Sequence, residues 1–313
     1  MTNTSVPHWD GRRYYSLDCY LKRTFHEKLY KLSLDAGMTC PNRDGTVASG
    51  GCIFCSSGGS GEFAADRSLS VEEQIQQAKE TVSRKFSGSR YIAYFQAFTN
   101  TYAPVDVLRG LFYPVIQRED IAVLSIATRP DCLEDEKIAL LKELRQIKPV
   151  WVELGLQTIH PQTAQHINRG YELPCFDSAV RRLKDAGMEV IVHTILGLPF
   201  ETREEMLQTA DYVGRSGADG IKLQLLHILE NTPLAQWYRS GLIRPMTEEE
   251  YLSIAAEILA VLPPDMVIHR LTGDGDKRIL LAPRWSGDKR HVLNALQHEL
   301  KIRGLYQGCA FRK

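Results

Sequence analysis

The chain has 313 residues, with 38 Lys and Arg against 38 Asp and Glu, so its formal net charge is zero. A composition of 43% hydrophobic and 24% charged residues is typical of a soluble globular protein, and zero net charge excludes a protein that is basic throughout for polyanion binding. No apolar run of about 18 residues predicts a membrane span, and the first residues lack the apolar segment of a signal peptide, so we expect a cytoplasmic protein.

Short β-rich runs alternate with helical segments along most of the chain. The runs lie at residues 29–34, 90–95, 121–127, 150–156, 189–196 and 219–229. Capping-box patterns at Ser70/Glu73 and Thr202/Glu205 predict the starts of two intervening helices, and residues 177–187 predict a third that ends at a glycine. Six such units predict an α/β protein with a parallel sheet, either an open doubly wound sheet or a partial barrel. In both folds, ligands bind at the carboxyl ends of the strands.

The pattern changes at residue 246. A Thr247/Glu250 cap predicts a helix over 246–263, followed by a strand over 266–271, two polar glycine-containing loops and a last helix. Lys and Arg outnumber Asp and Glu from residue 263 to the end, which indicates either a solvated face or a surface that contacts phosphate groups. We therefore divide the chain into an N-terminal extension (1–28), a core (29–245) and a C-terminal extension (246–313) that we expect to face the substrate.

Three of the seven cysteines lie in one glycine-rich segment after the first predicted strand, with the spacing Cys40-x11-Cys52-x2-Cys55. A structural zinc site usually has four Cys or His ligands, and the nearest histidine, His26, precedes the strand. A redox CxxC pair does not explain Cys40. A cubane iron–sulfur cluster on three thiolates leaves one iron open to a substrate or cofactor, and glycines let a loop wrap closely around it. The cluster explains all three cysteines; zinc, redox chemistry and an unliganded loop are the alternatives.

The segment resembles the cluster loop of radical S-adenosylmethionine (SAM) enzymes, in which three cysteines bind a [4Fe–4S] cluster and the open iron binds SAM. The resemblance implies Cys40, Cys52 and Cys55 as the cluster ligands and reductive cleavage of SAM to a 5′-deoxyadenosyl radical. It also implies a partial (β/α)6 TIM-like barrel, here with a short C-terminal α/β extension. The long first gap departs from the widespread form of the motif and resembles the group that includes the catalytic subunit of Elongator. The remaining cysteines are scattered, so we predict a single cluster.

The same resemblance implies contacts to SAM at the ends of the second, fourth and fifth predicted strands. The implied contacts are Gln96, Ala97, Thr99, Gln157, Arg169, His193 and Gly197. The second-strand segment FQAFTNTYAP lacks the Gly-Gly-Glu-like stretch that meets the SAM amino group in relatives, and Ala127 stands where some relatives have a SAM-binding Glu. Solvent-exposed side chains are the alternative for Gln157 and Arg169, and a hydrogen-bonded core histidine is the alternative for His193.

Candidate substrate residues lie after the sixth strand and in the polar C-terminal loops, which we expect at the mouth of the barrel. They are His227, Arg270, Asp274, Asp276, Arg284, Trp285, Lys289 and Arg290. Arginines that hold phosphate groups and a tryptophan that stacks on a base suit a nucleotide substrate; a solvated loop is the alternative. The sequence assigns no residue outside the cluster to a chemical step.

Over its whole length the chain resembles a family of bacterial radical SAM proteins of similar size, part of which is linked to wobble-uridine modification. The resemblance implies a tRNA substrate whose 5-carboxymethylaminomethyl group is converted to 5-aminomethyl, and an electron donor such as flavodoxin or ferredoxin. Two alternatives are a radical SAM enzyme that acts on a small molecule or a protein side chain, and a non-catalytic metal-binding module for nucleic acids. We expect no membrane partner.

Overall fold

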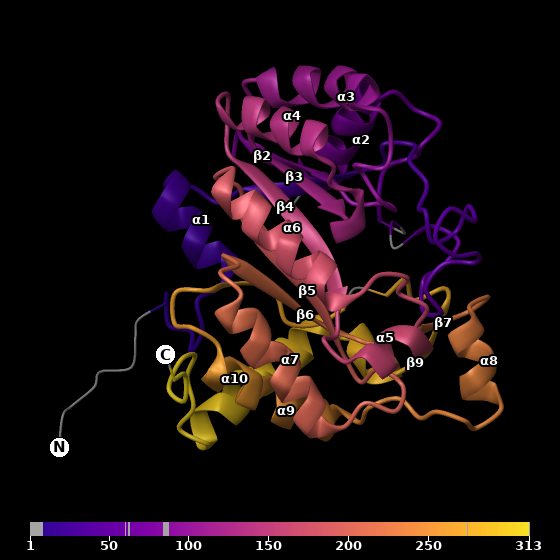
Figure 1. Cartoon of the computed structure of the whole chain (residues 1–313). Coiled ribbons are helices and arrows are strands. Elements are labelled where there is room, and N and C mark those ends of the chain that lie inside the picture. The colour runs from indigo at the N-terminus through magenta and orange to yellow at the C-terminus, as the bar shows by residue number, and fades with distance from the viewer. Residues whose placement is uncertain (1–8, 60, 62, 84–87, 274, 313) are drawn as a thin grey trace.

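A curled sheet of seven parallel strands forms the centre of the protein (Figure 1). The computed structural model describes residues 9–59, 61, 63–83, 88–273 and 275–312. The strands, in their order across the sheet, are β1 Tyr30–Leu34, β2 Tyr91–Phe95, β3 Ile121–Thr128, β4 Val150–Gln157, β5 Glu189–Leu196, β6 Gly220–Leu225 and β8 Val267–Arg270. The predicted α/β partial barrel is confirmed. It has one strand more than the six predicted units, because β8 of the C-terminal extension pairs with β6 in parallel.

Helices connect the strands and cover the outside of the sheet. They are α1 Leu17–Phe25, α2 Val71–Ser83, α3 Val105–Gln117, α4 Asp135–Arg145, α5 Pro161–His166, α6 Leu173–Asp185, α7 Arg203–Arg215, α8 Pro233–Arg239, α9 Glu248–Val261 and α10 Lys289–Ile302, with short 3-10 turns at Pro130–Cys132 and Arg284–Gly287. The capping boxes predicted at Ser70, Thr202 and Thr247 are confirmed. In each, the hydroxyl and the glutamate three residues later accept hydrogen bonds from each other's backbone N–H groups.

The two faces of the sheet have different partners. Outward-pointing strand residues such as Leu32 pack with the surrounding helices into the main core. On the inner face, at the amino ends of the strands, Trp151 packs with Leu21 of α1. Helix α1 therefore closes this end of the half barrel, and Ser16, just before it, pairs with Ile268 of β8. The opposite end, where the strands finish, is left for a ligand site.

The segment 219–229, predicted as one strand, is two separate elements, so this prediction is wrong. Strand β6 ends at Leu225, and β7 (Ile228–Leu229) pairs in antiparallel with β9 (Leu280–Ala282), which lies between the two predicted polar loops. Ile228 and Ala282 pack into an apolar cluster with Ile53 of the cysteine segment. Burial against residues that are distant in sequence thus overrides the continuous β pattern of the run.

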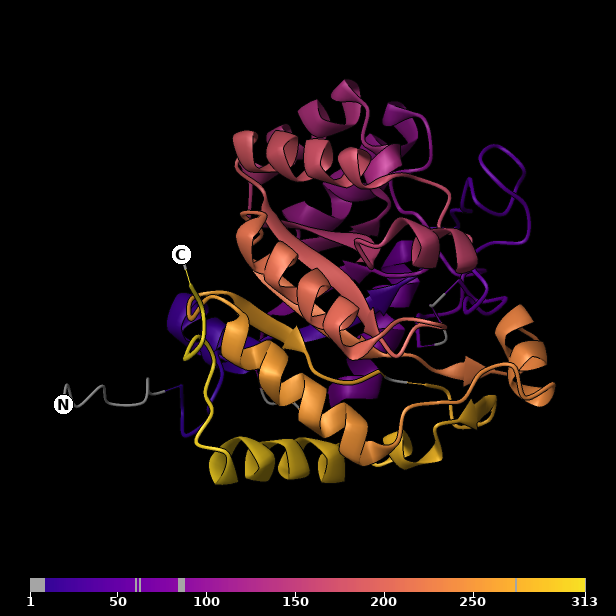
Figure 2. The same cartoon turned by 60° about the horizontal axis from the view of Figure 1, so that its bottom comes forward.

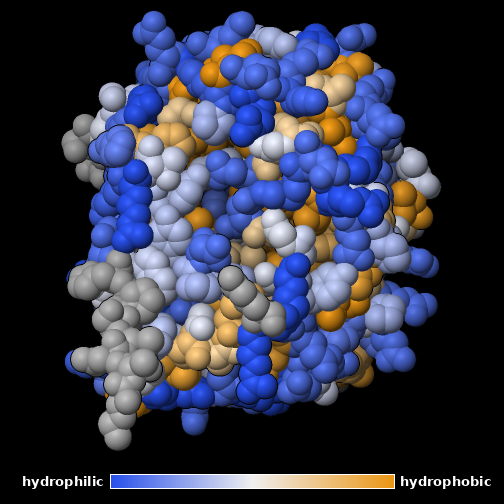
Figure 3. Space-filling view, turned by 60° about the vertical axis from the view of Figure 1, so that its left-hand side comes forward, coloured by the Kyte–Doolittle hydropathy of each residue, from blue (hydrophilic) through white to orange (hydrophobic). Residues whose placement is uncertain are grey.

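The C-terminal extension completes the sheet and then packs along its outer side. Helix α9 lies against both α7 and α10, as Figure 2 shows. Hydrophilic residues cover most of the face seen in Figure 3, and hydrophobic residues occur there in small patches. Within the described part of the chain, none of the helices has the length and hydropathy that a membrane crossing requires.

Candidate cofactor and substrate pocket

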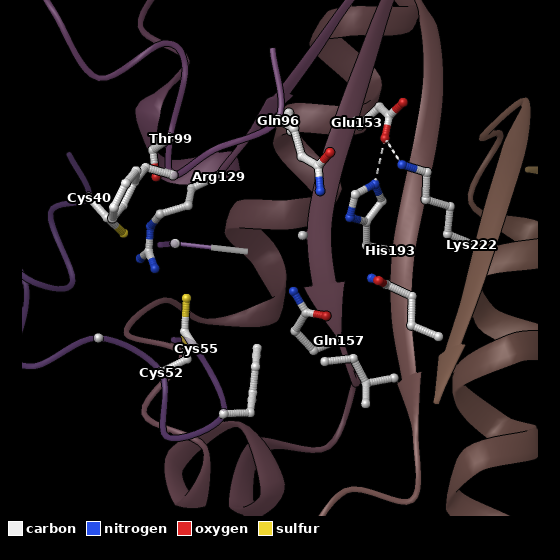
Figure 4. A pocket seen from close by; sticks show the side chains of 18 of the residues that line it. Cys40, Cys52, Cys55, Gln96, Thr99, Arg129, Glu153, Gln157, His193 and Lys222 are labelled. Atoms are coloured by element: carbon white, nitrogen blue, oxygen red, sulfur yellow. Dashed lines mark hydrogen bonds and ion pairs between the residues drawn. The ribbon is translucent and has the colours of Figure 1, made fainter. Parts of the chain in front are cut away.

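A pocket opens at the carboxyl ends of the strands, inside the curl of the sheet (Figure 4). The cysteine segment forms one side, and the ends of β2 to β6 and the loop after β8 form the rest. The predicted residues that line it are Cys40, Cys52, Cys55, Gln96, Thr99, Gln157, Arg169, His193, His227 and Arg270. The structure therefore brings together side chains from most of the length of the chain at the end of the barrel where ligands are expected.

The three cysteine side chains lie on the same side of this pocket (Figure 4). Cys40 follows β1, and the other two stand on a turn in which the Cys55 N–H donates to the Cys52 carbonyl at 2.9 Å. Gly50 and Gly51 precede this turn with φ values of 80° and 83°, a left-handed conformation that glycine adopts without strain. Gly50 and Gly51 therefore allow the bend of the loop that the sequence predicted.

Asn42 holds the cysteine segment in place, and Arg129 lies close enough to act on the charge of Cys52. Asn42 donates to the Cys52 sulfur at 3.6 Å and to the Asn168 carbonyl at 2.5 Å, which ties the segment to the end of α5. Arg129, just after β3, donates to both carboxylate oxygens of Asp131 at 2.9 and 2.7 Å. Burial raises the pKa of the Cys52 thiol to about 12, and the Arg129 guanidinium acts in the opposite direction. A cation at this position favours the thiolate form that an iron ligand needs.

Gln157 ends β4 in a strained conformation. Its φ is +69°, and the pairing register between β4 and β5 shifts at this point. The guanidinium of Arg169 holds the turn by donating to the carbonyls of Leu156 and Thr158 at 3.0 and 2.6 Å, and it also donates to the carbonyl of Tyr171. Arg169 therefore positions Gln157, and its direct contact with a cofactor stays a prediction. The side-chain oxygen of Gln157 is buried with no partner among the described residues, so it can accept a hydrogen bond from a ligand.

A buried charged group forms the floor of the pocket, on the right of Figure 4. Glu153 of β4 accepts hydrogen bonds from Lys31 Nζ at 2.6 Å, from Ser125 Oγ at 2.8 Å and from His193 Nε2 at 2.7 Å. It also pairs with the Lys222 ammonium. Glu153 is 1% exposed and Lys222 is 3% exposed, so the two charges are compensated by each other and by their neighbours.

The charges of the floor group set one another's protonation. Burial opposes ionisation of Glu153, but Lys222 and Lys31 outweigh it and hold the pKa of this carboxyl well below its ordinary value. Burial, assisted by Lys222, lowers the pKa of His193 to about 4. The imidazole is therefore neutral at pH 7, and its Nε2–H donates to the Glu153 carboxylate. Burial likewise lowers the pKa of Lys222 well below its ordinary value.

Several predicted site residues do not line this pocket. Ala97 is fully buried, and Gly197 lines a neighbouring pocket beside Met246. Trp285 donates its indole N–H to the Met246 carbonyl at 3.1 Å and packs against Tyr251, because the turn that carries it leads into α10. The other residues outside the lining are Asp276, Arg284, Lys289 and Arg290, and Asp274 lies outside the described residues.

Two family models match this chain. The family model described as the radical SAM superfamily matches residues 43–213, and the model described as the radical SAM C-terminal domain matches residues 218–302. The chain belongs to the radical SAM superfamily. It is an enzyme of that superfamily, and its cofactors are the [4Fe–4S] cluster and SAM that the superfamily uses.

Relatives cover the whole chain or about half of it. The chain is 44% identical to the Bacillus subtilis (strain 168) protein YtqA over 314 residues, which cover 100% of this chain and 98% of YtqA. It is 29% identical to the tRNA uridine(34) acetyltransferase of Dehalococcoides mccartyi over 154 residues, which cover 48% of this chain and 33% of the acetyltransferase. Its fold is similar to that of Methanocaldococcus infernus Elp3, with a TM-score of 0.67 and 15% identity over 89% of this chain and 64% of the other. The resemblance to Elongator-type radical SAM proteins is thus confirmed.

The pocket fits the cofactors of the superfamily. The thiolates of a cubane cluster bind different irons. The three cysteine side chains lie on the same side of one pocket, as a ligand set for such a cluster requires. The unpartnered oxygen of Gln157 offers a hydrogen-bond acceptor to SAM.

Sequence reasoning missed Arg129 and the floor residues Lys31, Glu153 and Lys222. A signal for the last three was present in the sequence, because each is a charged residue within a β-rich run: YKLSL, VWVELGL and GIKLQL. A charged side chain in a buried strand needs an opposite charge or a hydrogen-bond partner. Two lysines and one glutamate in three such runs therefore indicate an ion group inside the barrel.

Proposed function

We propose that this radical SAM enzyme modifies the wobble uridine of tRNA by converting a 5-carboxymethylaminomethyl group to 5-aminomethyl. The observation that carries the proposal is the match to a tRNA uridine(34) acetyltransferase over 154 residues, a region that includes half of this chain. The pocket supports it, since cysteines line one side and cationic side chains line the other. We infer that the protein works in the cytoplasm, where tRNA is modified.

We propose that Cys40, Cys52 and Cys55 hold the cluster and that Gln96 and Gln157 contact SAM. Bound together, these cofactors supply hydrogen-atom abstraction once an electron donor such as flavodoxin or ferredoxin has reduced the site. The protein's own residues hold and orient the reactants. Arg169 fixes the turn of Gln157 through backbone carbonyls, and Arg129 offsets the negative charge of the thiolates.

The proposed reaction removes two carbons from nitrogen. The hydrogen atom leaves the methylene carbon between the nitrogen and the carboxylate. The carbon radical that remains would lose one electron back to the donor that had reduced the site, and water would then hydrolyse the resulting imine at its C–N bond. The overall balance is that the modified uridine, SAM and water give 5-aminomethyluridine, glyoxylate, 5′-deoxyadenosine, methionine and one proton. This conversion releases a carbon fragment that can be measured separately from the nucleoside.

A groove away from the pocket supports contact with a large polyanion. Lys289 and Arg290 at the start of α10 line it together with Arg12 of the N-terminal extension. These cations come from the two ends of the chain and meet on one surface. We propose that they bind tRNA phosphates, which would make tRNA binding weaker as salt concentration rises.

The proposed function is tested by mass spectrometry of modified nucleosides in tRNA from a strain that lacks the gene. We expect 5-carboxymethylaminomethyluridine derivatives to accumulate and 5-aminomethyluridine derivatives to disappear. Expression of the wild-type gene restores the profile, and expression of Cys55→Ala does not. An unchanged wobble-uridine profile in the deletion strain would refute the proposed substrate.

A further inference from the structure

A second pocket lies beside the cofactor and substrate pocket. The two share part of a wall, because Leu226, which follows β6, lines both. The second pocket has a volume of about 480 Å³, which is within the range of ligand sites. It lies between the loop that follows β5 and the segment 242–246 that follows α8. A chain molecule whose reacting unit occupies the first pocket can therefore place its next unit in the second.

Phe200 presents an aromatic ring at this second pocket. It is 56% exposed, and Leu242, which also lines the pocket, is 55% exposed. The Phe200 ring contacts the rings of His166 on α5 and Trp237 on α8, with centroid distances of 5.1 and 6.1 Å. These two contacts restrain the ring, although more than half of the residue stays open to solvent. A restrained and exposed aromatic ring is a surface on which a flat group can stack.

The backbone of Phe200 adopts a left-handed conformation. Its φ is +65°, which is unusual for a bulky side chain. Strain of this kind persists only where the surrounding structure holds the residue, and it is concentrated at functional sites. The strained backbone and the two ring contacts together keep the side chain at the pocket, so its exposure is a defined feature of this loop.

Glu201 adds a carboxyl group to the lining of the same pocket. One of its oxygens accepts a hydrogen bond from Thr158 Oγ1 at 2.6 Å, and in the part of the chain that the structure describes no cation forms an ion pair with it. The two arginines that line the pocket, Arg203 and Arg244, are each paired with a different glutamate. Burial raises the pKa of Glu201 to about 7. A ligand that donates a hydrogen bond to this carboxyl group would favour its ionised form.

We propose that the second pocket binds the base of a nucleotide next to the target uridine in the RNA substrate. The base stacks on Phe200, and an N–H group on its edge donates to Glu201. Every nucleobase has a flat face for stacking and at least one N–H donor, so a base suits both features. The subsite rests on the proposed function, because it requires an RNA whose uridine occupies the first pocket. It adds to that function a contact with the neighbouring nucleotide.

The test measures the affinities of RNA stem–loops for the cluster-loaded enzyme by fluorescence anisotropy under anaerobic conditions. The intact stem–loop carries 5-carboxymethylaminomethyluridine at the wobble position, and two others lack the base immediately before or immediately after it. We expect the wild type to bind one of these abasic RNAs about tenfold more weakly than the intact RNA, the size of one stack of a base on an aromatic ring. In Phe200→Ala the ratio of these two affinities should fall close to one.

Two further variants serve as controls for this ratio. Phe200→Trp keeps a flat ring and should retain the tenfold ratio. Ile302→Ala removes an exposed apolar side chain at the end of α10, where the residue is 63% exposed, and should also retain it. A general effect of losing exposed apolar surface would lower the ratio in Ile302→Ala as well, and this outcome would count against the subsite.

Ratios near one for both abasic RNAs in the wild type, or a tenfold ratio that survives in Phe200→Ala, would overturn the subsite. The wobble-uridine profile of the deletion strain judges the proposed function separately. If deletion leaves tRNA unchanged but the ratio depends on Phe200, the subsite stands for a different RNA substrate. If deletion changes the wobble uridine but both abasic RNAs bind the wild type as tightly as the intact RNA, the function stands and the subsite falls.

Discussion

Replacement of Lys222 and Glu153, singly and together, measures how strongly the floor of the pocket depends on its buried ions. Lys222→Met leaves the Glu153 carboxylate 1% exposed, with Lys31, Ser125 and His193 as its remaining partners. Loss of one partner from a buried pair costs about 3–5 kcal/mol, and three surviving partners place the expected loss in the free energy of unfolding at about 3 kcal/mol. Glu153→Leu leaves the Lys222 ammonium with the Tyr94 hydroxyl at 3.1 Å, so we expect a similar loss of about 3 kcal/mol.

The double variant removes both ions and is expected to lose about 3 kcal/mol rather than the sum of about 6 kcal/mol, a coupling of about 3 kcal/mol. The assay is urea unfolding at pH 7, followed by circular dichroism, with all variants in the same cluster state. Lys184→Met is the matched control, because Lys184 and Asp219 form a pair whose side chains are 33% and 34% exposed. Its expected loss is below about 1 kcal/mol. Additive losses in the double variant, or a loss in Lys222→Met no larger than in the control, would refute the reasoning that Glu153 and Lys222 are buried ions that stabilise each other.

Three further predictions concern pH, the cysteine segment and a helix start. Burial raises the pKa of Glu201 from 4.5 to about 7, so the folded protein binds this proton more tightly than the unfolded chain does. The resulting stabilisation of the folded state is complete below pH 4.5 and is lost as the pH rises through 7. The free energy of unfolding should fall by up to about 3 kcal/mol over this range. Thermal melting from pH 5 to 8 should show this decline in the wild type and not in Glu201→Gln, and an equal decline in both would contradict it. Gly59→Ala places a Cβ 2.4 Å from the Phe98 ring at a φ of +61°, so we expect the variant to bind less iron. Gly45→Ala, whose Cβ has nothing within 4 Å, is the control and should keep its iron. Equal iron contents in the two variants would show that the cluster does not require the close packing of Gly59 on Phe98. Thr247→Ala removes the hydroxyl of a capping box and should lower the free energy of unfolding by about 1 kcal/mol in urea, and no measurable change would show that water replaces the cap.

Local signals in the sequence were enough to predict most elements of the fold. Hydrophobic patterns located six strands, and the Thr202 and Thr247 caps located two helix starts that the structure confirms. These features depend on neighbouring residues, so a single sequence contains the information for them. The segment at 219–229 was mispredicted, because Ile228 leaves the sheet to pack against Ile53, a partner far away in the chain.

The sequence by itself determined the cysteine segment and the alternation of strands and helices, and the resemblance of that segment to known cluster loops indicated the superfamily. Only the tertiary structure decided which charges meet: Glu153 pairs with Lys31, 122 residues away, and with Lys222, 69 residues away. It also placed Trp285 against Tyr251, outside the lining of the pocket. Arg169 lines the pocket and donates to backbone carbonyls, and its contact with SAM stays a prediction. The pattern within a strand determines which of its side chains share a face. The curl of the sheet and the register between its strands determine which side chains of different strands meet, and these depend on residues far apart in the chain.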